Sequence, residues 1–304
     1  MWRPEWPCPA SAILSQQRHG RADPTHLAGS DGSVWRALLS PEGPVSLRVV
    51  PRPGEGTVHA TAWGKGSDWA LAQVPALLGA DDDVSNFDPG HPLVAEAWRR
   101  HPHLRFSASG IVMDSLLPAI IEQKVTGQEA FAGYRALVRD HGAPAPGPGA
   151  ELGLRLQPTP EALRAVPSWE WLRLHVDPAR SRTIARAAPL ATSLERHARA
   201  SGPDLERALR SVPGVGVWTA AEVRARTLGD ADAVSFGDYH VAKDVGWALT
   251  GSPVDDAALA ELLTPWAGHR GRVVALIRIH AGGRPRRGPR MAPRTHLPGR
   301  TPGR

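Results

Sequence analysis

The sequence predicts a mostly helical protein in which the helical part follows a small α+β domain. Three short stretches, 34–39, 45–50 and 57–63, are bounded by Gly and Pro, and the last alternates in side-chain direction, as strands do. Beyond the acidic loop 81–83, apolar residues recur at helical spacing for nearly two hundred residues. The tetrapeptide at 213–216, PGVG, joins two of these predicted helices and is central to the predicted site.

The chain has 304 residues, which is enough for about two domains. We expect an irregular lead over residues 1–30, an N-terminal α+β domain over 1–80 and a helical region over 81–283. An Arg-, Pro- and Gly-rich tail over 284–304 is predicted to be disordered, because it has too few apolar residues for a core. Inside the helical region we expect helices near 91–100, 114–140, 160 onward, 180–199 and 259–280, with a flexible connector at 143–150.

Charge and cysteine usage limit the classes of function. The formal net charge is +6, but the tail holds seven Arg and no acid, so basic composition says little about the rest of the chain. The single cysteine, Cys8, excludes an internal disulfide and a four-cysteine iron-sulfur cluster. Because no apolar run is long enough to cross a membrane, we expect a cytoplasmic, nucleoid-associated monomer without a membrane partner.

The predicted hairpin has the features of a phosphate-binding turn. Gly214 and Gly216 permit positive φ in the turn, and a second helix over 217–228 is predicted to stop at Gly229. The N–H groups of Val215 and Gly216 would then lie at the N-terminus of that helix, which is a ready anion site. The first helix is predicted from its apolar residues at helical spacing, Leu205, Leu209 and Val212.

This hairpin, followed by Asp238 at 22 residues beyond Gly216, resembles the helix-hairpin-helix DNA glycosylases. The similarity is greatest to the alkylbase family, DNA-3-methyladenine glycosylase II, and it extends over about residues 79–280. It implies the helix-hairpin-helix glycosylase fold, an all-helical catalytic part behind the α+β domain, and it implies that Asp238 is the catalytic carboxylate. From the residues alone, Asp238 is also a good N-cap for a helix at 239–249, and the two roles are compatible.

The resemblance also implies a base pocket. It places Gln123 at the pocket mouth and Lys124 where the family often has an apolar wedge. Trp218 stands where glycosylase-lyases of the superfamily have a Schiff-base lysine. The resemblance therefore implies a monofunctional glycosylase, without lyase activity. Glu222 and His280 replace aromatic pocket residues. The residues alone also allow a solvated helix face for Gln123 and Lys124, a core position for Trp218 and a solvent-facing Glu222.

DNA contacts are expected from Lys124, from the hairpin residues Gly214, Val215 and Gly216, and from Thr219 on the first turn of the second helix. The resemblance further implies a structural monovalent cation, Na⁺ or K⁺, bound by the carbonyls of Arg210, Val212 and Val215. No other cofactor is expected.

The sequence therefore predicts a hydrolase of N-glycosyl bonds that acts in base excision repair on double-stranded DNA containing damaged, alkylated purines. A noncatalytic helix-hairpin-helix DNA-binding protein, or a glycosylase of the same superfamily with a neutral lesion as its substrate, are the alternatives. A metal-dependent nuclease is disfavoured, because the contiguous acids at 81–83 point in different directions.

Overall fold

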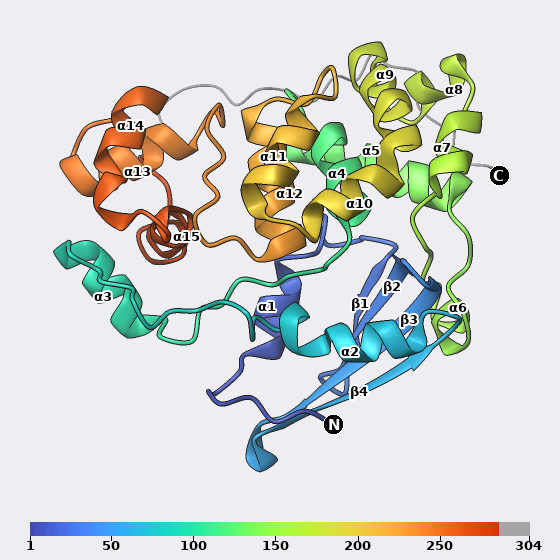
Figure 1. The fold of residues 1–304 in the computed structure, drawn as a ribbon, viewed down its shortest axis with the longest axis horizontal. Coiled ribbons are helices and arrows are strands. Elements are labelled where there is room, and N and C mark those ends of the chain that lie inside the picture. The colour runs from blue at the N-terminus through green and yellow to red at the C-terminus, as the bar shows by residue number, and fades with distance from the viewer. Residues whose placement is uncertain (286–304) are drawn as a thin grey trace.

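The computed structural model describes residues 1–285, and it confirms the predicted fold class, a small antiparallel sheet followed by a helical layer (Figure 1). The predicted disorder beyond Arg284 and Pro285 lies outside the described residues. The N-terminal elements are α1 (Ala10–Ser15), β1 (His26–Ala28), β2 (Val34–Ser40), β3 (Gly43–Arg52), the 3-10 turn η1 (Pro53–Glu55), β4 (Thr57–Trp63) and α2 (Ser67–Leu77).

The four strands form an antiparallel meander in the order β1-β2-β3-β4. In the register, Val49 pairs with Val34 on one side and with Ala60 on the other. The three predicted strands are confirmed, whereas the lead over 1–30 is not irregular throughout, because it contributes α1 and β1. Both elements are very short, so their periodicity was too brief to detect.

The two faces of the sheet are covered by different parts of the chain. Helix α2 packs on one face, where Val74 joins the apolar core of the strands. On the other face Trp35 and Trp63 stack with ring centroids 5.3 Å apart, and Leu154 and Leu156 pack beside them. The segment 143–150 is therefore not a flexible connector, because it forms part of this cover and leads into α6.

The helical layer begins after a loop at residues 78–91. Its elements are α3 (Pro92–Arg100), α4 (Val112–Ile121), α5 (Gly127–His141), α6 (Pro148–Glu151), α7 (Pro160–Ala165), α8 (Ser168–Arg173), α9 (Pro178–Ala187), η2 (Ala188–Leu190), α10 (Ala191–Ala198), α11 (Gly202–Arg210), α12 (Val217–Leu228), α13 (Val241–Thr250), α14 (Asp256–Leu262), η3 (Thr264–Trp266) and α15 (Arg270–His280).

Two long helices expected from the sequence are broken. The helix at 114–140 is wrong as a single element, because Thr126 and Glu129 form a capping box that starts α5 anew, after a turn in which Lys124 has a φ of 53°. The helix at 180–199 divides into α9 and α10 at Pro189, which cannot donate a backbone hydrogen bond. The expected N-cap of α7 is confirmed, since the Thr159 side chain accepts the N–H of Ala162.

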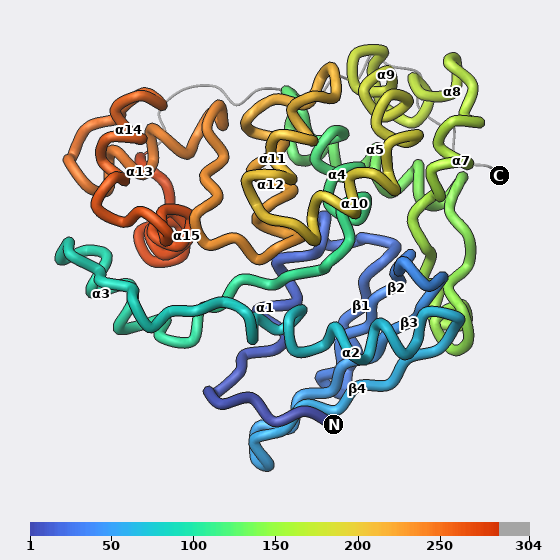
Figure 2. Tube along the Cα trace, viewed as in Figure 1, coloured from blue at the N-terminus to red at the C-terminus, as the bar shows by residue number. Residues whose placement is uncertain are grey.

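The helices build two apolar cores. One joins α4, α5 and α7 through α12, and the other joins α3 with α13, α14 and α15. The chain passes from one core to the other through residues 101–111 and 229–240 (Figure 2). The second of these crossings follows the hairpin helix α12 and carries Asp238.

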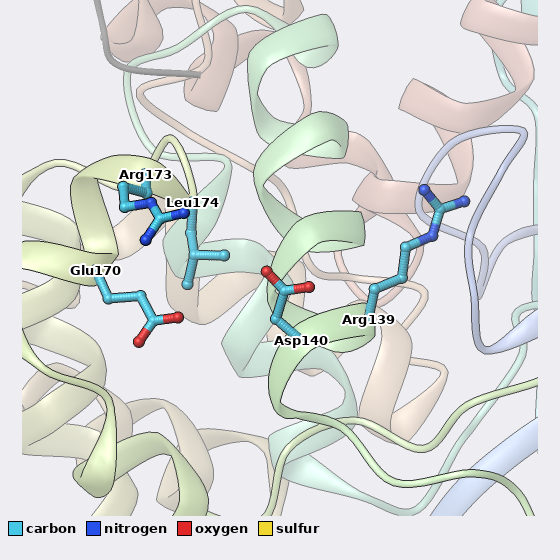
Figure 3. Close-up of a pocket in the computed structure, with 5 residues that line it drawn as sticks. All are labelled: Arg139, Asp140, Glu170, Arg173 and Leu174. Atoms are coloured by element: carbon cyan, nitrogen blue, oxygen red, sulfur yellow. The ribbon is translucent and has the colours of Figure 1, made fainter. Parts of the chain in front are cut away.

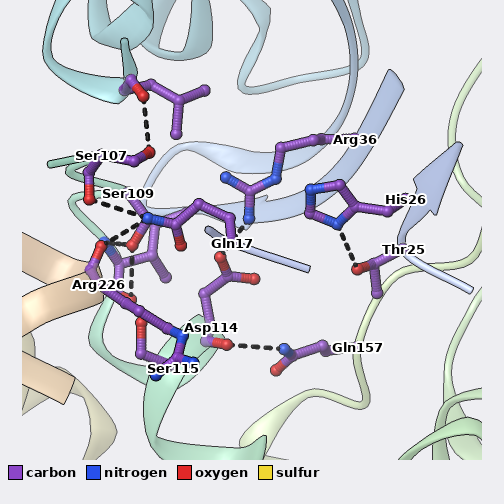
Figure 4. A network of polar contacts seen from close by, with 12 residues as sticks. Gln17, Thr25, His26, Arg36, Ser107, Ser109, Asp114, Ser115, Gln157 and Arg226 are labelled. Atoms are coloured by element: carbon purple, nitrogen blue, oxygen red, sulfur yellow. Dashed lines mark hydrogen bonds and ion pairs between the residues drawn. The ribbon is translucent and has the colours of Figure 1, made fainter. Parts of the chain in front are cut away.

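A buried polar network joins the sheet to the helical layer (Figure 4). Arg36 on β2 is 2% exposed, and its Nη2 lies 2.6 Å from Oδ2 of Asp114 on α4. The Gln17 amide donates to the carbonyls of Ser107 and Arg226, each at 2.9 Å. Since these contacts are desolvated, they fix the position of α4 and α12 relative to the sheet.

Candidate active site

The hairpin between α11 and α12 depends on one glycine for its geometry. Gly214 has a φ of 101°, and a Cβ there would lie 2.1 Å from the Thr183 hydroxyl oxygen, so a side chain does not fit. Gly216 differs from the expectation, because its φ is −100° and a Cβ would meet open space. Gly229 ends α12 with a φ of 65°, which confirms the predicted stop.

The amides available to a phosphate are one residue further along than expected. The Val215 N–H, predicted to bind phosphate, donates to the Val212 carbonyl at 2.9 Å, so the turn itself uses this donor. Gly216 is the N-cap of α12 and Val217 its first residue, and both are exposed. The Gly216 and Val217 amides are therefore the exposed backbone donors at this helix N-terminus.

Gln123 connects the end of α4 to the hairpin. Its amide nitrogen donates to the Gly214 carbonyl at 3.1 Å and to the Thr219 hydroxyl at 2.8 Å. Thr219 is only 2% exposed, so its side chain is not a phosphate donor, contrary to the sequence expectation. Lys124 follows Gln123, is exposed, and has the positive φ noted above, which is uncommon outside glycine.

Asp238 occupies the loop between α12 and α13 and caps α13. Its Oδ1 accepts the N–H of His240 at 2.7 Å and that of Val241 at 3.0 Å. No hydrogen bond among residues 1–285 ends on its Oδ2, and the residue is half-buried. The helix begins at Val241 with His240 in the N-cap position, two residues later than predicted, so Asp238 binds the start of α13 from just outside the helix. One carboxylate oxygen is left for another partner.

Trp218 lies beside this loop. A Cβ on Gly237, the residue before Asp238, would lie 3.9 Å from the Trp218 Cβ, and Gly237 has a φ of 88°. The Trp218 side chain is half-buried. The fold therefore brings the first turn of α12 next to the carboxylate-bearing loop.

No protein-family model and no curated protein matches the amino-acid sequence. Solved structures do match. The 3-methyladenine DNA glycosylase from Archaeoglobus fulgidus has a TM-score of 0.74 at 17% identity, over 91% of this chain and 97% of that one. The Clostridium acetobutylicum 8-oxoguanine glycosylase/lyase, solved in complex with double-stranded DNA, has a TM-score of 0.64 at 12% identity, over 88% and 92%.

The fold is that of the helix-hairpin-helix DNA glycosylases. Among residues 1–285, no helix of this glycosylase fold is long and apolar enough to span a membrane.

In this glycosylase fold Glu222 is tied to the loop of Asp238. Its carboxylate accepts from the Ser235 hydroxyl and pairs with Arg226, while the Asp238 N–H donates to the Ser235 carbonyl at 3.1 Å. Burial by itself raises the pKa of Glu222, but Arg226 and Ser235 outweigh it and lower this pKa overall. These contacts favour the ionised form of Glu222 and direct its carboxylate to Ser235 and Arg226.

His280 is the last residue of α15 and lies beside His101, which follows α3. Its ring lies 6.5 Å from that of His101 at the end of α3.

The sequence analysis did not predict the contacts of Ser235 and Arg226 with Glu222. It also did not predict the pair between Glu122 and His19, in which Oε1 of Glu122 lies 2.9 Å from Nδ1 of His19. Glu222 and Arg226 are four residues apart on a helix, and this spacing alone is a signal for an ion pair. His19 lies in the N-terminal lead, far away in sequence from Glu122, and no local pattern connects them.

A surface pocket of about 430 Å³ lies elsewhere, between α5 and α8, and is lined by charged groups (Figure 3). Its lining residues, Arg139, Asp140, Glu170, Arg173 and Leu174, include none of the site residues described above.

Gly216 allows a clean test of the hairpin as an anion site. Gly216→Ala should be tolerated, since its φ is negative and a Cβ meets open space. Gly216→Asp adds a negative charge beside the amides but also supplies a good N-cap, so stability should hold while DNA binding falls about tenfold or more. Binding of both variants to lesion-free and abasic-site duplexes, with melting temperatures alongside, checks this. Equal affinity of the two variants would exclude phosphate contact at this turn.

Proposed function

We propose that this protein is a monofunctional DNA glycosylase that hydrolyses the N-glycosidic bond of damaged, alkylated purines in double-stranded DNA, as a monomer acting in base excision repair. The observation that carries this proposal is the position of the loop that bears Asp238, which passes Trp218 at the neighbouring Gly237 on the crossing that follows the hairpin helix. Similar structures include a 3-methyladenine glycosylase and an 8-oxoguanine glycosylase/lyase in complex with DNA, which supports it.

Asp238 would act on the sugar of an extruded nucleotide. Breaking the bond to the base builds positive charge on the deoxyribose, and a carboxylate about 4 Å away contributes roughly 4 kcal/mol at an effective dielectric constant near 20. Its free Oδ2 also suits it to orient or deprotonate the attacking water. The Oδ1 hydrogen bonds to α13 hold the group in place before substrate arrives.

The remaining site residues would hold the strand and the flipped base. The Gly216 and Val217 amides would bind a phosphate, and the Trp218 indole would stack on the base. Lys124 would fill the gap in the duplex with its aliphatic stem, with the ammonium group near phosphate. Gln123 fixes the hairpin relative to that turn.

We propose that the hairpin carbonyls bind a monovalent cation. The Val212 carbonyl accepts one hydrogen bond, and a carbonyl oxygen has a second lone pair. Together with the carbonyls of Arg210 and Val215 it would hold Na⁺ or K⁺, which would supply positive charge for anchoring a phosphate.

Monofunctional chemistry gives a first prediction, because an indole at Trp218 cannot form a Schiff base. We expect product strands to stay intact until alkali is added, and EDTA to have no effect. Gel analysis of end-labelled duplexes before and after alkali measures this. A covalent enzyme–DNA adduct trapped by borohydride would contradict it.

The substrate class gives a second prediction. An ionised Glu222 cannot protonate a leaving base, whereas a cationic alkylated base leaves without protonation. We therefore expect 3-methyladenine to be released faster than hypoxanthine from matched duplexes, at both pH 6 and pH 8. Preference for hypoxanthine that is lost in Glu222→Gln or His280→Ala would instead indicate a neutral-lesion glycosylase.

A further inference from the structure

An exposed stripe of side chains continues from Asp238 along α13. Tyr239 is 70% exposed and Trp247 is 42% exposed, and Lys243 lies between them in sequence. Lys243 and Trp247 are four residues apart on α13 and therefore share one face of the helix, with Lys243 half-buried. Tyr239 lies in the turn before the helix. The other face of α13 is in the second apolar core, where Val241 and Val245 are buried.

The stripe is organised, because the Lys243 ammonium lies 3.9 Å from the centroid of the Tyr239 ring. Single exposed aromatic residues are normal on a protein surface, but two that flank a cation on one face, starting next to a candidate catalytic carboxylate, form a surface with a chemical preference. Aromatic rings beside a cation suit stacked bases, sugars and phosphates.

The acidic groups near the stripe have partners of their own, and the Asp256 Oδ2 accepts the Gly237 N–H at 2.8 Å. The neighbouring acid on α13, Asp244, is buried, and its Oδ1 accepts the N–H of Arg284 at 3.3 Å and lies 3.6 Å from the Arg284 Nε. That carboxylate is therefore directed to Arg284 rather than to the stripe. The Arg-rich end of the chain begins at this contact.

We propose that Tyr239, Lys243 and Trp247 form a contact surface for the DNA strand that flanks the extruded nucleotide. The inference rests on the proposed function and extends it by naming where the neighbouring strand is held. The helix from Val241 to Trp247 spans about 9 Å, Tyr239 lies two residues before it, and successive nucleotides of a strand are separated by about 3.4 Å along the duplex. Trp247 would then act roughly three to four nucleotides from the lesion, with Tyr239 closest to it.

The test uses the full chain and duplexes carrying an abasic-site analogue. We expect Tyr239→Ala and Trp247→Ala each to weaken binding by about 5- to 20-fold, the scale of one stacked base. Lys243→Ala should lower the salt dependence of binding by about one phosphate contact. Trp169→Ala is the matched control, because Trp169 is 60% exposed on α8 with Arg173 over its ring, at the other end of the helical layer (Figure 1).

Moving the analogue toward either duplex end tests the geometry. Affinity of the unsubstituted protein should drop when fewer than about four base pairs remain on one side, and Trp247→Ala should lose this dependence. Wild-type affinity and unchanged end dependence in Trp247→Ala, with melting temperature preserved, would overturn the inference even if base release is normal. Loss of self-association instead of DNA affinity would overturn it too. If the substitutions in the stripe weaken DNA binding but the unsubstituted protein releases no base, only the catalytic proposal is contradicted.

Discussion

Asp238→Asn should lower the rate of base release on the order of a hundredfold or more, the scale of losing one preorganised electrostatic group. Asparagine keeps an oxygen that can accept the His240 and Val241 N–H groups, so the cap of α13 should survive. The change removes the negative charge that stabilises the sugar, and it leaves the surrounding geometry unchanged. Single-turnover release from a lesion-containing duplex measures the effect.

The control for this variant is its affinity for an abasic-site analogue, which should stay within a few-fold of the unsubstituted protein. Ser235→Ala provides a second comparison, since it removes the hydroxyl contact that ties the loop to Glu222. It should lower base release less than Asp238→Asn, because the carboxylate remains. Wild-type turnover in Asp238→Asn would exclude Asp238 as the catalytic group.

Asp114→Asn should lower the free energy of unfolding by about 3–5 kcal/mol, the typical cost of removing one partner of a buried ion pair. Arg36 is buried, and its ion-pair partner is the Asp114 carboxylate. Without that negative charge the guanidinium stays desolvated and uncompensated. Urea unfolding followed by circular dichroism gives the size of the change.

Arg48→Ala is the matched control for this stability effect. Arg48 lies on β3 opposite Trp35 of β2, and it pairs with Asp31 at the surface, where water screens the charges. Its removal should leave the unfolding midpoint nearly unchanged. If Asp114→Asn and Arg48→Ala unfold alike, the buried pair does not hold the sheet to the helical layer.

Sequence periodicity predicted the fold where elements were long enough to show it. The strands at 34–39, 45–50 and 57–63 alternate or are enclosed by turn residues, and all three are present. The breaks near Lys124 and Pro189 were missed because apolar spacing continues across them, although a capping box and a proline mark both places. The packing of 143–156 on the sheet depends on tertiary contacts that no local pattern contains.

The candidate site was predictable to the extent that it is local in sequence. The hairpin, its stop at Gly229 and the capping by Asp238 follow from residue types and spacing. Gln123 binds Thr219 and Ser235 binds Glu222, and each of these contacts joins residues from different elements. Spacing along the sequence alone therefore could not indicate them. These contacts change which groups remain available for DNA.

The most direct measurement of the account is release of free base by the full chain, followed by mass spectrometry, from duplexes that carry either 3-methyladenine or hypoxanthine. The account predicts free 3-methyladenine, an intact strand with an alkali-labile site, and loss of this activity in Asp238→Asn. Tight binding to the abasic-site analogue with no base released from either duplex would contradict it, and would indicate a noncatalytic DNA-binding protein with a glycosylase fold.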